Sequence, residues 1–335
     1  MKDFSQEMFE RINDISQCKK AGEVYVGVEK KYWVNHNGKL FLFKIDDGYE
    51  YGFYELLFAH LAKKMEVDCV NCYPAQNQDA KGVIVESFLS DEILRSVSLD
   101  KILKRYNLPI GLGLNSECCL SLENFFQSER ILNADGLFFK PGVKEKFEQI
   151  VLMDFILVQT DRHTQNVEFL MYAGEGRNAY LDLAPCYDNG RMLGADAGRI
   201  DSEHLRETVD YEYSFAPFMT FEFENRTLYG DNIEKIAEII AKHVIQKPHL
   251  RQIYDRFRQI DIQQEIEYVA NAGGYKIEHE QLQVIKGLFQ RRLGVLEKCV
   301  ELLEKQNPKY STKSNLEGIK DTNVSDEKIE DIEKK

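Results

Sequence analysis

Residues 159–166 read QTDRHTQN and residues 183–190 read LAPCYDNG, and these two segments decide the fold that we expect. Between them, VEFLMYAG predicts a strand running into a turn, and RNAYLDLAP predicts the returning strand. The first segment contains Asp161 and Asn166, and the second contains Asp188 followed by a common turn sequence. Each segment alone is an unspecific loop pattern, but the two together, in this order, form a specific one.

These three side chains are the oxygen donors that phosphoryl transfer requires. A carboxylate must orient the attacking hydroxyl and accept its proton, and a second carboxylate, commonly with an amide oxygen, must hold magnesium against the nucleotide phosphates. Magnesium takes few protein ligands and keeps some of its waters, so one Asp and one Asn suffice. We therefore predict Asp161 as the base, and Asn166 and Asp188 as the metal ligands. Gly190 is expected to permit the backbone turn that follows the metal-bound Asp188.

The run MDFILVQTDRHTQN at 153–166, followed by LAPCYDNG, resembles the catalytic and metal loops of HipA-like serine/threonine protein kinases. In ordinary protein kinases an arginine precedes the catalytic aspartate, whereas here an arginine and a histidine follow it. The resemblance implies that Asp161 is the catalytic acceptor, that Asn166 and Asp188 hold magnesium, and that His163 lies beside the phosphates. A structural hydrogen-bonding role in the loop is the alternative for His163.

The chain resembles a compact, stand-alone member of that family, because the separate N-terminal subdomain of the longer toxin-type proteins does not precede its first predicted strands. The resemblance implies a protein substrate and a small antitoxin-like partner, although part of the surface for such a partner is expected to be missing. Asp154 matches an acidic position of the family's motif, and we expect it to stabilise the catalytic loop.

The upstream half of the chain has the pattern of a nucleotide-binding lobe. Residues 24–28 and 32–34 are rich in β-branched and aromatic side chains, an Asn-Gly hairpin signal stands at 37–38, and residues 40–44 form an alternating third strand. Lys44 ends that otherwise apolar strand, at the place from which a lysine reaches the α- and β-phosphates of a nucleotide. A lysine that merely ends the strand at the surface is the alternative.

A helix is predicted over residues 51–65, where apolar side chains recur at helical spacing. Glu55 lies on a face that carries small alanines, so this helix can approach the sheet closely and Glu55 can meet Lys44. Such a Lys–Glu pair directs the ammonium towards phosphate in kinases and serves as a positional switch. We therefore predict Lys44, Glu55 and Asp161 as the catalytic set, with a solvated helix glutamate as the alternative for Glu55.

The resemblance implies two further nucleotide contacts. The strand predicted at 82–89 ends where a kinase hinge runs, and we carry the hinge over to Glu86 and Phe88, whose backbone groups would meet the adenine edge. The loop GVEKK, from Gly27 to Lys31, resembles the Gly-x-x-x-Lys phosphate loop of HipA-like kinases, so both of its end residues are predicted to bind nucleotide. By themselves, the residues indicate only a strand end and an ordinary hairpin turn.

We predict four segments along the chain: an N-terminal helix, a nucleotide-binding N-lobe, a helical catalytic C-lobe and a disordered tail, at residues 1–22, 23–89, 90–305 and 306–335. Within the C-lobe, apolar periodicity predicts helices at residues 90–106, 121–132, 143–160, 232–246, 247–271 and 278–305. The polar stretch 191–217 occupies the place of an activation segment. The tail has too few apolar side chains to offset the entropy of ordering.

Composition excludes several function classes. The chain has 335 residues, 43% of them hydrophobic, which is enough to bury a core in two lobes. Its net charge of −13, from 43 basic and 56 acidic residues, argues against direct nucleic-acid binding and against attachment to an anionic membrane. With no long apolar run and a charged start, a cytoplasmic protein is expected. The seven cysteines, Cys69 and Cys72 included, are expected to be free thiols without zinc.

These observations predict an α+β, two-lobed protein-kinase-like fold with a small β-rich N-lobe and a mainly helical C-lobe. The predicted activity is transfer of the γ-phosphate of ATP, with Mg²⁺, to a Ser or Thr hydroxyl of a protein. A phosphoinositide-type lipid kinase and a nucleotide-binding pseudokinase scaffold are the alternatives, because the identity of a substrate lies in surface shape rather than in these motifs.

Overall fold

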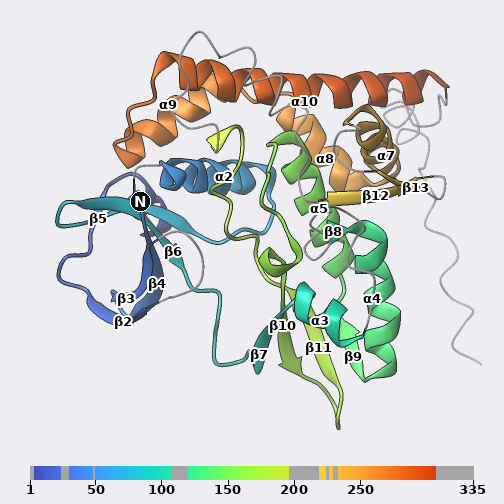
Figure 1. The fold of residues 1–335 in the computed structure, drawn as a ribbon, viewed down its shortest axis with the longest axis horizontal. Coiled ribbons are helices and arrows are strands. Elements are labelled where there is room, and N and C mark those ends of the chain that lie inside the picture. Colours follow the sequence, from blue (N-terminus) through green and yellow to red (C-terminus); the bar gives the residue numbers. More distant parts are fainter. Residues whose placement is uncertain are drawn as a thin grey trace, which may run out of the picture.

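The computed structural model describes residues 4–23, 30–47, 50–106, 120–195, 219–223, 226–228 and 233–306. The predicted strand at 24–28 with its Gly27, most of the stretch 191–217 and the tail after Gln306 lie outside the described residues. In the described ranges a β-rich N-terminal lobe stands beside a larger, mainly helical C-terminal lobe (Figure 1). This is the α+β, two-lobed arrangement that the sequence predicts.

The N-terminal lobe is built on a six-stranded sheet of order β1-β5-β6-β4-β3-β2, against which helix α2 (Tyr51–Met65) packs. The strands are β1 Asn13–Asp14, β2 Lys19–Glu23, β3 Lys31–His36, β4 Lys39–Ile45, β5 Cys72–Asn77 and β6 Ala80–Glu86. Asn37 and Gly38 join β3 to β4 with φ of 53° and 80°, the two left-handed residues that a tight hairpin turn requires. The predicted hairpin and the predicted helix over 51–65 are both present.

Strand alternation gives this sheet two different faces. Phe41 and Phe43 of β4 point to one face, where they pack with Met8 of helix α1 (Phe4–Phe9) in a small apolar cluster. Leu42 and Lys44 alternate with them and point to the other face, which meets α2 and a cavity between the lobes. Because side chains alternate along the strand, Lys44 points towards α2.

The N-terminal helix is shorter than predicted. The sequence predicts a helix over residues 1–22, but α1 ends at Phe9, and β1 and β2 follow within the same range. Asn13 accounts for the change, because its side-chain amide donates to the backbone oxygens of Met8 and Pro74, at 2.8 Å in each case. A partner on β5, distant in sequence, thus competes successfully with local helix formation in this polar segment.

The C-terminal lobe combines helices with a four-stranded sheet of order β7-β10-β11-β9. The strands of that sheet are β7 Arg95–Ser98, β9 Leu137–Phe139, β10 Glu168–Ala173 and β11 Ala179–Leu183. A three-stranded sheet contains β8 Leu120–Ser121, β12 Met219–Phe223 and β13 Arg226–Leu228. The helices are α3 Leu99–Arg105, α4 Leu122–Ala134, α5 Val143–Ile156, α7 Ile233–Gln246, α8 Pro248–Phe257, α9 Ile262–Gly273 and α10 His279–Gln306. Helix α10 runs along the outside of the lobe, and α9 packs against α2 (Figure 1).

Two predicted helices differ from the observed elements. Residues 95–98 lie in the predicted helix 90–106 but form strand β7, which pairs antiparallel with β10. The segment Arg-Ser-Val-Ser alternates in side-chain size and contains a β-branched residue, so the backbone partners on β10 decide its conformation. The predicted helix 247–271 is divided into α8 and α9, because the Asp261 carboxylate accepts hydrogen bonds from two following backbone amides and starts a new helix.

A continuous apolar core runs from α2 through the C-terminal helices, and α5 lies within it. Phe147 of α5 stacks on Phe125 of α4 with ring centroids 3.7 Å apart, and Phe125 also stacks on Phe169 of β10 at 5.6 Å. Because α5 ends just before the segment 159–166, this packing determines where the following loop begins.

Candidate active site

Lys44 is the centre of a buried group of charges. Its Nζ atom donates to the Glu55 carboxylate of α2, and it donates to Asp188 Oδ1 at 2.6 Å. The side chains of Lys44 and Glu55 are 8% and 2% exposed, whereas that of Asp188 is 29% exposed. The Lys44–Glu55 pair expected from the sequence is thus present, and Asp188 links it to the segment 183–190.

The beginning of α2, one turn before Glu55, is held by Asp46. The backbone amide of Gly52 donates to Asp46 Oδ1, and the Tyr275 hydroxyl donates to Asp46 Oδ2, both at 2.8 Å. Burial raises the pKa of Asp46 to about 6, and the hydrogen bonds from Gly52 and Tyr275 oppose that rise. The loop after α9, which carries Tyr275, therefore contacts the helix that positions Glu55.

The outer side of α2 is held by α9. Glu265 of α9 is bonded by His60 Nε2 at 2.7 Å and by Lys64 Nζ at 2.5 Å. Burial lowers the pKa of His60, and the Glu265 carboxylate opposes that effect. Since these contacts join α2 to the C-terminal lobe, they restrict rotation of the helix that carries Glu55.

Asp188 lies in the loop after β11 with a φ of 57°, a left-handed conformation that is uncommon for a residue other than glycine. The Lys44 ammonium holds the pKa of the Asp188 carboxyl well below its usual range. Gly190, expected to make the turn, has no positive φ. Instead, a Cβ atom at Gly190 would lie 3.3 Å from the Cβ and backbone oxygen of Tyr51, so this glycine permits close approach to α2.

Asp161 stands in the loop after α5, and its side chain is 25% exposed. Its backbone oxygen accepts hydrogen bonds from Asn166 Nδ2 and from the His163 amide, both at 2.9 Å. His163 Nε2 and Arg191 Nη1 approach Asp161 Oδ1 at 3.8 and 4.0 Å. The Asn166 side chain is oriented through its nitrogen, and its oxygen is the end that can hold a cation.

His163 has the structural role that the sequence leaves open for it. Its Nδ1 atom accepts a hydrogen bond from the Gln165 amide at 3.2 Å, and its backbone oxygen accepts one from the Asn166 amide at 2.9 Å. These bonds cap the short 3₁₀ turn Thr164–Asn166. The ring therefore helps to shape the loop between Asp161 and Asn166.

Arg162 is the residue that the sequence analysis did not single out, and it joins the two motif segments. Its guanidinium is 1% exposed and pairs with Asp154 of α5, with Nε 3.0 Å from Oδ2. It also donates to the backbone oxygen of Tyr187 at 2.7 Å and to the side chain of Asn189. Because these two residues flank Asp188, one buried side chain holds the segment 159–166 against the segment 183–190. The sequence offers one signal for Arg162: it directly follows Asp161 and lies eight residues after Asp154.

A cavity of about 240 Å³ lies beside Lys44, between the lobes. Lys31, Glu86, Phe88 and Asp188 line it together with Lys44, so five of the predicted site residues share this space. Three predicted residues of the segment 159–166 do not line it, although Arg162 of the same segment bonds residues on both sides of Asp188. The three residues are Asp161, His163 and Asn166.

The remaining walls of the cavity are mainly apolar and aromatic, and the sequence analysis missed them. They include Trp33, Leu42, Val70, Val85 and Tyr187. Trp33 and Leu42 lie opposite one another on β3 and β4, two positions from Lys31 and Lys44. Since side chains two positions apart share a face of a strand, alternation from the predicted lysines would have identified both residues.

Glu86 and Phe88 contribute differently to the cavity wall. The Glu86 amide donates to the backbone oxygen of Asn71 at 2.9 Å, and its carboxylate is bonded by Lys39 at 2.5 Å and by Asn71 Nδ2 at 3.0 Å. The Phe88 ring packs against that of Tyr187 at a tilt of 40°, with centroids 5.6 Å apart. The backbone amide of Phe88 has no hydrogen-bond partner among the described residues. Phe88 is therefore the better placed of the two to present a backbone donor.

Two solved structures share the fold of this chain. The Helicobacter pylori proinflammatory kinase CtkA superposes with a TM-score of 0.59 and 14% identity, over 86% of this chain and 98% of that one. HipA of Shewanella oneidensis MR-1, solved with HipB and operator DNA, superposes with a TM-score of 0.52 and 16% identity, over 84% of this chain and 68% of that one. The chain has a HipA-like kinase fold. No protein-family model matches it, and no curated protein matches its sequence.

The donor set of this HipA-like fold fits a magnesium ion. Asn166 and Asp188 offer an amide oxygen and a carboxylate, and Mg²⁺ prefers hard oxygen ligands completed by phosphate and water. In the part of the chain that the structure describes, no group of three or more His, Cys, Asp and Glu side chains could hold a metal.

The described cysteines form no disulfide bond with one another. Cys69 and Cys72 are free thiols, as are the other cysteines in the described ranges. Burial raises the pKa of both thiols, which makes them poor metal ligands. Among the described helices, none combines the length and the apolar character needed to cross a membrane.

Proposed function

We propose that the chain is an ATP- and Mg²⁺-dependent Ser/Thr protein kinase of the HipA-like type. The observation that carries this proposal is the position of Lys44, which is paired with Glu55 and Asp188 at the wall of the cavity between the lobes. Burial of these charges costs desolvation energy that their pairing returns only in part, so a contribution to stability does not explain the arrangement and a function does. The fold that the chain shares with the kinase CtkA supports the same conclusion.

Each group of the cavity has a distinct task in this proposal. Lys44 directs its ammonium towards the α- and β-phosphates, and Glu55 maintains that direction. The hinge from Glu86 to Phe88 follows the adenine edge, where Phe88 presents its backbone N–H. The aromatic and aliphatic walls exclude water from the base. Asp161 orients the acceptor hydroxyl and takes its proton during transfer.

The phosphate end of the cavity combines cations with metal ligands. Asn166 and Asp188 would hold Mg²⁺, which when bound neutralises charge on the phosphate oxygens. Lys31 lines the same cavity, and its charge contributes to the low pKa of Asp188, which supports a phosphate contact for this lysine. We include Gly27 in the phosphate loop, although it lies outside the described residues.

The test is transfer of label from γ-³²P-ATP by the purified chain, with Mg²⁺ or with EDTA. Acceptors are the chain itself, casein and vesicles that contain phosphoinositides, and mass spectrometry locates the phosphate. Mg²⁺-dependent label on Ser or Thr is the expected result. Label on the lipid alone would show a lipid kinase instead, and the absence of ATP binding would contradict the whole proposal.

A nucleotide-binding pseudokinase is the second candidate, and the contact between Lys44 and Asp188 favours it. Asp188 Oδ1 lies 2.6 Å from Lys44 Nζ, so the carboxylate that would hold magnesium is engaged by an ammonium in this structure. A kinase must release or share that oxygen when Mg²⁺ binds. ATP binding that is equally tight with Mg²⁺ and with EDTA, without transfer to any acceptor, would establish the pseudokinase.

The HipA likeness extends the proposal to a protein partner. HipA in the similar structure is in a complex with HipB and operator DNA, and we propose a small antitoxin-like protein as a companion of this chain. The net charge of −13 opposes direct contact of the chain itself with DNA. Purification from native cells with mass measurement tests this: a stoichiometric small companion supports the extension, and a homogeneous free chain contradicts it.

A further inference from the structure

Two polar side chains that line the cavity between the lobes have no part in the proposed reaction. They are Glu168, the first residue of β10, and Ser96 of β7. In the proposal the lysines and Asp188 face the phosphates and the metal, and the Glu86 carboxylate is bonded by Lys39. The carboxylate of Glu168 therefore remains without a task, although it lies in a space assigned to an anionic nucleotide.

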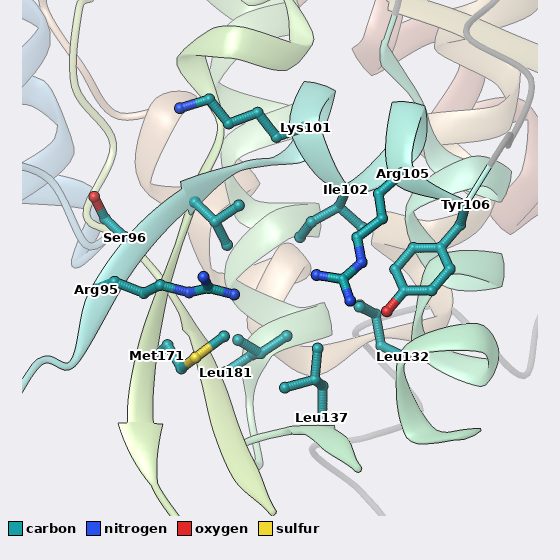
Figure 2. Close-up of a pocket in the computed structure, with 11 residues that line it drawn as sticks. Arg95, Ser96, Lys101, Ile102, Arg105, Tyr106, Leu132, Leu137, Met171 and Leu181 are labelled. Carbon is teal, nitrogen blue, oxygen red and sulfur yellow. The ribbon is translucent and has the colours of Figure 1, made fainter. Parts of the chain in front are cut away.

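The two side chains lie on one face of the four-stranded sheet. Glu168 pairs with Ser98 in the antiparallel ladder of β10 and β7, and Ser96 lies two positions before Ser98. Residues two positions apart share a face of a strand, so Glu168 and Ser96 are diagonal neighbours on the face that meets the cavity. The opposite face carries Met171 and borders a second cavity, of about 270 Å³. Figure 2 shows the Ser96 hydroxyl pointing away from Met171 and Leu181.

Neither the Glu168 carboxylate nor the Ser96 hydroxyl has a hydrogen-bond or ionic partner within the described ranges. Both residues are half-buried, so solvent reaches them only in part. A nucleotide that fills the cavity excludes this solvent, and a carboxylate that is then left without donors costs the loss of its hydration. The ligand must therefore bring hydrogen-bond donors to this part of the cavity.

Tyr187 shows where Glu168 lies along the cavity. The Tyr187 ring packs against Phe88 of the proposed hinge, and the next residue is Asp188, a proposed metal ligand. Burial raises the pKa of the Tyr187 hydroxyl, and the nearby charges of Glu168 and Asp188 raise it further. Glu168 also stands two residues after Asn166. Its carboxylate thus lies between the base end and the phosphate end of the cavity, where a nucleotide has its sugar.

The chemistry of a nucleotide leads to the same part of the ligand. Phosphate oxygens are anionic and repel a carboxylate, and the edge of the base faces the hinge in the proposal. The 2′- and 3′-hydroxyls of ribose are two neighbouring donors, and a carboxylate has two oxygens that can accept both hydrogen bonds. Dinucleotide-binding folds read ribose with an acidic residue on its 2′-hydroxyl. The sugar is therefore the part of a nucleotide that suits Glu168.

We propose that Glu168 is a specificity-determining residue that binds the 2′- and 3′-hydroxyls of a ribonucleotide, with the Ser96 hydroxyl as a second contact to the sugar. This role rests on the proposed function only in that a nucleotide occupies the cavity. It requires no phosphate transfer, so it holds for a pseudokinase as well as for a kinase. The consequence is that the chain prefers ATP to its deoxy analogues.

The test is isothermal titration of the full chain with ATP, 2′-deoxy-ATP and 3′-deoxy-ATP in the presence of Mg²⁺. The variants are Glu168→Ala and Ser96→Ala. Glu175→Ala is the matched control, because it removes the same charge from an exposed residue in the turn between β10 and β11, outside the cavity. Titration with GTP shows whether a substitution alters recognition of the base instead.

We expect the unmodified chain to bind each deoxy analogue with a Kd about 10-fold higher than that of ATP, because one hydrogen bond to a charged group is lost. Glu168→Ala should bind the three nucleotides with Kd values within about 2-fold of one another. Its affinity for the deoxy analogues should not fall, since removal of the carboxylate also removes its repulsion of phosphate. A general defect of the fold would instead weaken the binding of all three.

The remaining variants should give smaller effects. Ser96→Ala should reduce the preference for ATP by about 2- to 3-fold, because it removes one neutral hydrogen bond. Glu175→Ala should retain the full preference. The melting temperature of Glu168→Ala without nucleotide should match that of the unmodified chain, since the carboxylate bonds no other group of the described residues.

Two results would overturn the role of Glu168. One is equal binding of ATP and both deoxy analogues by the unmodified chain, and the other is an unchanged preference in Glu168→Ala. A change in the preference for ATP over GTP, with the preference for ribose intact, would assign the carboxylate to the base and also reject the proposal. Absence of nucleotide binding would reject both this role and the proposed function. Binding that discriminates ribose, without transfer to any acceptor, would support Glu168 as the sugar contact and contradict only the kinase activity.

Discussion

Lys44 and Arg162 are two buried cations, each paired with a carboxylate, and they differ in what surrounds the pair. Arg162 is 1% exposed and its partner Asp154 is fully buried. The nitrogens of Arg162 also bond the residues on both sides of Asp188. Lys44 is bonded to Asp188, whose side chain is 29% exposed and lines the cavity. The first pair holds loops together, whereas the second has a side open to a ligand. Removal of the first should affect stability, and changes at the second should affect nucleotide chemistry.

The largest effect is expected at Asp161, the residue directly before Arg162. Asp161→Asn removes the proposed base but leaves the Arg162 contacts intact, so transfer should fall by about two to four orders of magnitude. ATP affinity and the melting temperature should stay close to those of the unmodified chain. Single-turnover transfer and isothermal titration measure the two quantities. A variant with near-normal transfer and an intact fold would remove Asp161 from the mechanism.

Arg162→Met tests the fully buried pair of Arg162 and Asp154. It leaves the Asp154 carboxylate buried without its partner, which should lower the free energy of unfolding by about 3–5 kcal/mol. The double variant Arg162→Met, Asp154→Leu removes both charges and should recover part of that loss. Urea unfolding followed by circular dichroism measures both variants. If the single variant were as stable as the unmodified chain, the pair would not be what holds the two loops together.

Asp188→Asn tests the pair of Lys44 and Asp188, which is open to the cavity. It keeps the shape of the side chain but removes the charge that Lys44 and Mg²⁺ would share, so Mg²⁺-dependent affinity for ATP should fall about 10-fold. The thermal stabilisation by saturating ATP and Mg²⁺ should then decrease by about 1.4 kcal/mol, in line with mass action. The same measurement with EDTA is the control. A variant that retained the full Mg²⁺-dependent shift would exclude Asp188 as a metal ligand.

The smallest effect is expected at Asp46, which bonds the start of α2, the helix that carries the Lys44 partner Glu55. Its pKa of about 6 in the fold exceeds the ordinary value of 3.8, so its contribution to stability is full below pH 3.8 and is lost as the pH rises through 6. The side chain of Asp46→Asn does not titrate. Between pH 4 and pH 7, the free energy of unfolding of this variant should therefore rise by about 1–2 kcal/mol relative to that of the unmodified chain. Denaturant unfolding at several pH values measures the difference. Parallel pH profiles of the two proteins would contradict the raised pKa.

The elements that the sequence predicted well are those decided by neighbouring residues. The hairpin at 37–38 requires left-handed residues, and the helix over 51–65 follows from apolar spacing along its own turns. The pair of Lys44 and Glu55 could also be anticipated, because strand period and helix period direct both side chains to the same space. Their catalytic roles, like that of Asp161, are proposals that the mutations above test.

Other elements depended on partners that are distant in the chain. Residues 95–98 became a strand because β10 offers it backbone partners, and Asn13 turned the chain away from a helix because β5 accepts its hydrogen bonds. Gly190 was expected to make a turn, but the close approach of α2 is what requires a residue without a side chain. Contacts of this kind have no periodic signature in the local sequence.

The sequence by itself determined the β-rich and helical halves, the order of the two motif segments and the identity of the charged residues between them. Only the tertiary structure decided that Arg162 would be buried between those segments, and that Glu168 and Ser96 would line the cavity between the lobes. The physical reason is range: propensity and periodicity act over a few residues, whereas burial and charge pairing depend on which distant segments the core brings together.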